Sequence, residues 1–170
     1  MQRLTEDIAR ILGIILTILM AVMVIDVTWQ VITRFILKNP SGFTEELAGF
    51  LLIWIGLLGA SYAYYTKAHL GIDIVTFRLT GLKKQVIDIL INVIVLLFAL
   101  IVMVIGGMRL VNITFTLRQL SPALGIEMGY IYLVIPVSGV LVMYFAIHFI
   151  VQTIRSKPLE STEHVIRTVD

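Results

Sequence analysis

Hydrophobic residues are gathered into four long runs along the chain, at residues 11–37, 47–65, 86–108 and 130–154. A helix rises about 1.5 Å per residue, so roughly 20 predominantly apolar residues cross the hydrocarbon core of a bilayer. Each run is long enough. The pattern predicts an all-α integral membrane protein with four transmembrane helices.

The stretches between the runs, residues 38–44, 66–85 and 110–129, hold turn-forming and charged residues and are predicted to be loops. The first run exceeds the 7–15 residues of a signal-peptide core, and no small-residue cleavage site follows it, so we expect it to remain in the protein. We therefore expect a single four-helix transmembrane domain at residues 1–154 and a polar cytoplasmic tail at 155–170.

Composition agrees with a lipid environment. Hydrophobic residues make up 59% of the 170 residues and charged residues 14%, against about 45–50% and about 25% in soluble domains. The 13 Lys and Arg nearly balance the 11 Asp and Glu, which argues against a nucleic-acid partner. No cysteine is present, which excludes disulfides and thiolate metal sites. The three histidines are scattered, so we expect no metal site.

The distribution of cations predicts orientation. An even number of spans places both termini on one side, together with the loop at 66–85. That side carries nine of the 13 Lys and Arg residues, and the opposite side carries four. The positive-inside rule then places both termini in the cytoplasm.

Two neighbouring carboxylates, Glu45 and Glu46, stand at the start of the second run. Acidic residues in a first helical turn are favoured by the helix dipole, and Thr44 is a candidate N-cap. Adjacent residues project about 100° apart and do not share one environment. The alternative is that one glutamate pairs with a cation, either Arg34 or a residue of another protein.

Asp26, Gln30 and Arg34 follow one another at four-residue spacing and form a polar stripe on the first span. Such residues are costly in lipid, so the stripe is expected to face protein. Asp26 has two interpretations, a structural hydrogen-bonding residue or a proton or cation site.

The second span carries small residues on nearly one face, which allow close approach of another helix in lipid. The contact is either with a helix of this chain or with a partner subunit. These helix-packing positions are Gly49, Gly56, Gly59, Ala60 and Ala63.

Three further features refine the helices. Alternating apolar and polar residues at 71–79 predict a short amphipathic interfacial helix between helices 2 and 3. The third span is expected to continue through Arg109 toward Arg118. Pro136, followed by Ser138 and Gly139, predicts a kink or local unwinding in the fourth span.

Several strings resemble a known family when taken in order. They are WQVITRF at 29–35, FTEELAGFLLIW at 43–54, LGA at 58–60, HLGID at 69–73, SPALGIEMGYIY at 121–132 and IPVSG at 135–139. Together they resemble the small membrane subunit of tripartite ATP-independent periplasmic (TRAP) transporters, the DctQ-type family, over about residues 10–150. Phe43 stands where tryptophan is common, and Glu127 where proline is common, a departure that concerns the outer loop containing Ser121 and Pro122.

The resemblance implies a sodium-coupled secondary transporter that imports an organic acid, of the C4-dicarboxylate or sialic acid type, across the bacterial inner membrane. Its partners would be a large transmembrane transport subunit and a periplasmic substrate-binding protein, with phospholipids around them. The family's substrate and Na⁺ sites belong to the large subunit. This chain would then be a scaffold subunit with no catalytic, substrate-binding or metal residue and no cofactor of its own.

Two other functions would each rest on single residues of the sequence. A proton-coupled four-helix small-molecule exporter would use Asp26 as its titrating carboxylate. A haem or quinone anchor of a respiratory complex would use His69 and His148.

Overall fold

A computed structural model describes residues 2–38, 41–67 and 82–155 of the chain. The helices are α1 (Gln2–Phe35), α2 (Gly42–Tyr65), α4 (Leu82–Phe98), the π-helix η1 (Ala99–Gly106), α5 (Gly107–Thr116), α6 (Met128–Tyr132) and α7 (Val134–Arg155). The predicted interfacial helix at 71–79 and the predicted tail lie outside these residues, apart from Arg155.

Within residues 2–38, 41–67 and 82–155, four helical segments are long and apolar enough to cross a membrane, which confirms the predicted all-α fold with four transmembrane helices. They are Arg3–Phe35, Gly42–Tyr65, Lys84–Thr116 and Met128–Arg155. The third joins α4, η1 and α5 without a break and runs to Thr116, so the predicted extension beyond residue 108 is also confirmed. Each helix begins before its apolar run because backbone hydrogen bonding continues into the polar flanks, where water accepts the charged side chains.

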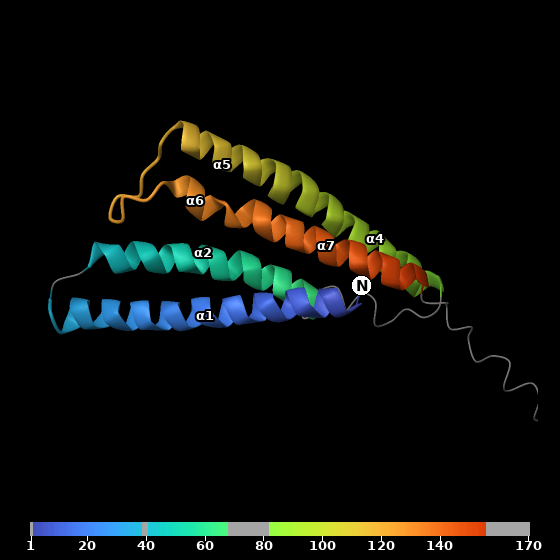
Figure 1. Cartoon of the computed structure of the whole chain (residues 1–170), viewed down its shortest axis with the longest axis horizontal. Helices are drawn as coiled ribbons and strands as arrows, with labels where there is room; N and C mark the ends of the chain where they lie inside the picture. The colour runs from blue at the N-terminus through green and yellow to red at the C-terminus, as the bar shows by residue number, and fades with distance from the viewer. Residues whose placement is uncertain (1, 39–40, 68–81, 156–170) are drawn as a thin grey trace, which may run out of the picture.

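The four spans form an open row rather than a closed bundle (Figure 1). Helix α1 packs against α2, α2 against α7, and α7 against α4 and η1. The row fans apart toward the end that carries the α1–α2 and α5–α6 connections, while the start of α1 and the end of α7 lie at the opposite end (Figure 1). We call these two ends the loop end and the terminal end.

The core centres on α7. Its Phe145 and Ala146 are completely buried, and they belong to one cluster with buried residues of α1, α2 and η1, among them Leu12, Leu58 and Ala99. Burial is greatest here because α7 is flanked by helices on two sides, whereas α1 lies at an edge of the row.

Helix α7 crosses the third span at two glycines. A Cβ atom added at Gly139 would lie 2.7 Å from the Met103 Cβ atom, and one added at Gly107 would lie 2.9 Å from the Ile135 Cγ2 atom. Any larger side chain would force the two helices apart. The π-helical stretch η1 faces this crossing, and small residues therefore set the closest approach of the two spans.

The fourth span is interrupted at Leu133, between α6 and α7, three residues before Pro136. Proline has no backbone N–H, so the carbonyl of Tyr132 loses its helical donor. The predicted disturbance near Pro136 is therefore present and lies on its N-terminal side. Beyond it α7 continues as regular helix through Ser138 and Gly139.

Hydroxyl groups in the spans mostly hydrogen-bond to a carbonyl one turn earlier in their own helix. Thr17 Oγ1 donates to the Gly13 carbonyl at 2.9 Å, and Thr114 Oγ1 donates to that of Leu110 at 2.8 Å. Thr28 and Thr116 make the same bond. These hydroxyls are satisfied without a neighbouring helix.

Fewer side-chain hydrogen bonds join different helices. The Tyr64 hydroxyl donates to Asn92 Oδ1, linking α2 to α4. Ser61 Oγ lies 3.3 Å from the Ser138 carbonyl oxygen, between α2 and α7. Thr5 Oγ1 lies 3.0 Å from the Tyr144 hydroxyl and ties the start of α1 to α7. These hydrogen bonds therefore join different helices at several positions along the row.

Candidate functional site at the loop end

Glu46 holds the α5–α6 loop against the start of α2. One of its carboxylate oxygens, Oε2, accepts hydrogen bonds from the backbone N–H groups of Ala123 at 3.0 Å and Leu124 at 2.9 Å. Consecutive N–H groups that converge on one oxygen form a small anion-binding concavity. Glu46 therefore fixes a loop more than 70 residues away in the sequence.

The loop has its own internal order. The Ser121 N–H donates to the Ile126 carbonyl at 2.9 Å, and the Gly125 N–H donates to the Ser121 carbonyl at 2.9 Å. Gly125 adopts φ +66°, a left-handed conformation that glycine reaches without steric cost. An isolated antiparallel bridge between Leu120 and Glu127 closes the base. The turn therefore presents a defined shape at the loop end.

The predicted outer-loop residues occupy distinct positions in this turn. Ser121 is buried, and its Oγ accepts a hydrogen bond from the Leu124 N–H at 3.3 Å. Pro122 is exposed at the turn. Glu127 is half-buried and precedes α6, and its side chain makes no capping hydrogen bond.

The start of α2 differs from the prediction in its N-cap. The N-cap is Ser41, and Thr44, predicted as the cap, lies within the first turn and donates to the Ser41 carbonyl at 2.9 Å. The helix begins earlier than the apolar run suggests, which moves the cap upstream. Among the described residues no ion pair joins Arg34 to Glu45 or Glu46; Glu46 binds backbone amides instead, and Glu45 is exposed.

The polar stripe of α1 does not share one environment. Asp26 is only 6% exposed, and its Oδ2 atom has no hydrogen-bond partner among the residues that the structure describes. Gln30 is half-buried, and Arg34 is exposed near the loop end. Since α1 packs chiefly against α2, the Asp26 carboxyl group lies in the seam between these two helices.

The small-residue face of α2 is largely uncovered. Gly49, Gly56 and Ala60 are exposed, and a Cβ atom added at Gly49 or Gly56 would meet nothing within 4 Å. Gly59 alone approaches α1, where an added Cβ atom would lie 4.0 Å from Leu16 Cδ2. Ala63 is half-buried. Packing among the residues that the structure describes therefore does not explain the small residues at Gly49 and Gly56.

Metal and haem chemistry finds no support in the described part of the chain. No group of three His, Asp or Glu side chains there is placed to hold a metal ion. His148 lies beside Thr5, with 3.3 Å between its Nδ1 atom and Thr5 Oγ1. His69, the other histidine of the anchor hypothesis, lies outside the described residues.

The sequence matches the family described as tripartite ATP-independent periplasmic transporters, DctQ component, over residues 23–156. The match covers the second and third spans, the fourth span, and the part of the first span from residue 23 onward. The chain belongs to this family. It is therefore a component of a transporter and not an enzyme, and the resemblance drawn from the sequence strings is confirmed.

Individual relatives support the same family. The sialic acid TRAP transporter small permease protein SiaQ of Vibrio cholerae is 28% identical over 145 residues, covering 85% of this chain and 82% of that protein. The C4-dicarboxylate TRAP transporter small permease protein DctQ of Rhodobacter capsulatus is 28% identical, covering 60% of this chain and 44% of that protein.

A third relative is much longer. The isethionate TRAP transporter permease protein DctMQ of Oleidesulfovibrio alaskensis is 33% identical over 96 residues, which cover 56% of this chain but 15% of that protein. In that permease a segment similar to this chain is thus part of a larger polypeptide.

Proposed function

We propose that this chain is the small scaffold subunit of a sodium-coupled importer of an organic acid. Its partners are a large transmembrane transport subunit and a periplasmic substrate-binding protein. The observation that carries the proposal is the open row of spans in a member of the DctQ family. A single layer of helices leaves two broad apolar faces uncovered, and an uncovered face suits a subunit that packs against a larger membrane protein.

The small residues of α2 favour one face for this contact. Gly49, Gly56 and Ala60 lie on one stripe, are exposed and have open space above them. A partner helix could approach this backbone closely and gain van der Waals contact, the main source of helix association in lipid. The longer DctMQ relative, in which a similar segment is joined to more chain, supports a large subunit beside this one.

The loop end is proposed to face the periplasm. In the sequence, nine of the 13 Lys and Arg residues belong to the termini and to the segment between the second and third spans. By the positive-inside rule, this distribution supports termini on the cytoplasmic side of the bacterial inner membrane. The turn held by Glu46 would then be available to the binding protein. A loop that is ordered before contact costs less conformational entropy on binding than a flexible one.

Substrate choice and sodium coupling are assigned to the other two proteins. The relatives carry the names of three different organic anions, sialic acid, C4-dicarboxylate and isethionate. The spans of this chain offer Asp26 as a buried acidic side chain, but no cluster of metal-ligating groups among the described residues. An organic acid is therefore the proposed substrate class.

The test is to co-express this chain with the large membrane subunit encoded beside it and to tag only this chain. We expect the pair to survive detergent extraction and gel filtration as one species with one copy of each. In proteoliposomes it should take up the organic acid only with a sodium gradient and the binding protein present. Purification of this chain alone, or uptake without the binding protein, would contradict the proposal.

Two pairs of variants connect the test to the structure. Gly49→Leu with Gly56→Leu should reduce recovery of the large subunit, while Leu52→Ile on the same helix should not. Glu46→Ala should keep the complex but lower uptake at limiting binding protein, while Glu45→Ala should resemble wild type. Wild-type uptake by Glu46→Ala would contradict the proposed contact between the α5–α6 loop and the binding protein.

A further inference from the structure

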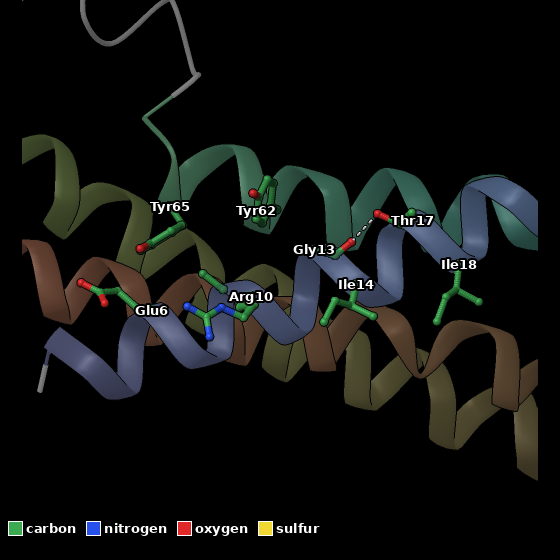
Figure 2. A pocket seen from close by; sticks show the side chains of 9 residues that line it. Glu6, Arg10, Gly13, Ile14, Thr17, Ile18, Tyr62 and Tyr65 are labelled. Atoms are coloured by element: carbon green, nitrogen blue, oxygen red, sulfur yellow. Dashed lines mark hydrogen bonds between the residues drawn. The ribbon is translucent and has the colours of Figure 1, made fainter.

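A groove of about 570 Å³ runs along the seam between α1 and α2 near the terminal end (Figure 2). It is lined by Glu6, Ala9, Arg10, Gly13, Ile14, Thr17 and Ile18 of α1 and by Tyr62 and Tyr65 of α2. None of these residues takes part in the contacts of the loop end or in the small-residue stripe of α2.

The lining is ordered by polarity along the helix axis. Arg10 and Glu6 line the part of the groove toward the terminal end, and Ile14 and Ile18 line the part that runs toward the middle of the span (Figure 2). The two isoleucines are 55% and 57% exposed. Arg10 and Ile18 are about 12 Å apart along the axis at 1.5 Å per residue. The groove is thus charged at one end and apolar over the rest.

The floor of the groove suits an apolar occupant. Thr17 is the polar residue deepest along α1, and its hydroxyl donates to the Gly13 carbonyl at 2.9 Å (Figure 2). Gly13 lies under the Tyr62 ring, and a Cβ atom added there would be 3.5 Å from Tyr62 Cε2. The Thr17 hydroxyl would therefore keep its hydrogen-bond partner beneath a hydrocarbon chain.

The polar end of the groove has unused donors. Among the described residues the Arg10 guanidinium makes no ion pair, and the hydroxyls of Tyr62 and Tyr65 make no hydrogen bond. A second hollow adjoins this end, shares Glu6 and Tyr65 with it, and is also lined by Lys67. The Lys67 Nζ atom lies 5.0 Å from the centroid of the Phe149 ring in that second hollow. Across the two adjoining hollows, two cations accompany one carboxylate, so this end of the groove is complementary to an anion.

We propose that this groove binds one glycerophospholipid with an anionic headgroup. The phosphate lies at Arg10 within reach of the tyrosine hydroxyls, and one acyl chain lies along Gly13, Ile14 and Ile18. Basic pockets between membrane helices on the cytoplasmic side recognise anionic headgroups in this way. Tyrosine suits the boundary because its ring is apolar and its hydroxyl is polar.

The occupant is a lipid rather than a helix of the large subunit for a geometric reason. At about 100° per residue, Tyr62 and Tyr65 project to the side of α2 opposite Gly49 and Gly56. A partner on the small-residue stripe therefore leaves the groove facing the bilayer. The lipid site needs only the fold of this chain, so its test can fail or succeed independently of transport.

The test is native mass spectrometry of the full chain in complex with its large subunit, after exchange into detergent with phosphatidylglycerol or phosphatidylcholine. The wild-type complex should retain more phosphatidylglycerol than phosphatidylcholine. Arg10→Gln should weaken that retention about fivefold, as expected for one cation near a lipid surface. Lys84→Gln, at the terminal end but on α4 and outside the groove, should retain lipid as wild type does.

A second variant separates the acyl chain from the headgroup. Gly13→Leu fills the floor and should reduce retention of both lipids, while leaving the complex intact. A photo-crosslinking residue in place of Ile18 should label lipid. Equal retention of the two lipids by wild type, unchanged retention by Arg10→Gln, or a crosslink from position 18 to the large subunit would each overturn the proposal.

Discussion

Glu45 and Glu46 are adjacent in the sequence, yet only one of them has a described structural role. Glu46 turns toward the α5–α6 loop and accepts two backbone hydrogen bonds, whereas Glu45 is exposed. One residue along a helix changes the direction of a side chain by about 100°. The pair therefore provides a matched set of variants in which the same chemical change is made with and without a loop contact.

Glu46→Gln should loosen the loop without unfolding the spans. The neutral amide is a weaker acceptor than a carboxylate, so the N–H groups of Ala123 and Leu124 should exchange with deuterium faster than in wild type. The Met128 N–H, bonded to the Gln119 carbonyl at 2.9 Å, provides an internal reference. Glu45→Gln should leave all three rates unchanged. Equal exchange in both variants would mean that the carboxylate does not hold the loop.

Asp26 differs from Glu46: its carboxyl group is buried, and one carboxylate oxygen has no hydrogen-bond partner within the described part of the chain. A charged Asp at the centre of a membrane helix costs about 2.5–3.5 kcal/mol on insertion scales. We expect Asp26→Leu to raise the free energy of unfolding by about 1–3 kcal/mol, measured in mixed detergent micelles. Val27→Leu, on the exposed side, is the control. Loss of stability, or loss of the large subunit, would show that Asp26 has a partner outside this chain.

Residue patterns identified these positions but not their partners. The sequence marks Glu46 as unusual, because a charge opens an apolar run. It cannot indicate the partner, since the two donors are backbone N–H groups whose placement depends on the turn at Ser121 and Gly125. The N-cap was predicted at Thr44 but lies at Ser41. Helix boundaries depend on backbone geometry, which the position of a hydroxyl residue in the sequence does not reveal.

At the scale of elements, the crossing of α7 and the third span depends on Gly139. An added Cβ atom would lie 2.7 Å from Met103 Cβ and 3.3 Å from the backbone carbon of Met103, which cannot rotate away. Gly139→Ala should therefore destabilise the protein by about 1–3 kcal/mol, the usual cost of overpacking, in the same unfolding measurement.

Gly106→Ala supplies the comparison. Its added Cβ atom would meet only the Ile101 carbonyl oxygen, at 3.6 Å, an ordinary contact. Alanine is also the better helix former, so this variant should be neutral or slightly stabilising. If the two variants lose stability equally, helix propensity rather than the crossing would govern the effect.

The spans themselves were predictable because membrane helices must satisfy every backbone group internally, which makes a long apolar run almost synonymous with a helix. The π-helical stretch Ala99–Gly106 was not predictable. Its residues are uniformly apolar and carry no local signal for a π-helix, and Met103 and Val104 within it lie against Gly139 of α7. The interruption of the fourth span was predictable from Pro136, because proline lacks the backbone N–H that would bond the carbonyl four residues earlier.

At the scale of the whole molecule, the open row makes a specific prediction about neighbours. The chain has no cysteine, so crosslinks between engineered cysteine pairs form without competition from native thiols. Leu16→Cys with Gly59→Cys should be linked by a short bifunctional thiol reagent, because the Leu16 Cδ2 atom lies 4.0 Å from the Cβ position of residue 59 and the two positions therefore face each other. Val22→Cys with Met108→Cys should not, because α1 and α5 lie at opposite edges of the row (Figure 1). Efficient linkage of the second pair would indicate a closed bundle.

The row was the part of the fold least accessible from sequence. Four spans of this kind are compatible with a closed bundle or a row, and apolar side chains serve equally well against lipid or against another helix. The exposed Gly49 and Gly56 show the same ambiguity. Small residues indicate that something approaches closely, but not whether it belongs to this chain.

The hydroxyl bonds within single helices have a consequence for biogenesis. The Thr17 and Thr114 hydroxyls donate to carbonyls of their own helices, so these two groups need no partner from another span when α1 and the third span enter the bilayer. Bonds between spans, such as that of Tyr64 with Asn92, form only afterwards. Insertion and lateral assembly are thereby separate steps, and the second can wait until the larger permease has been synthesised.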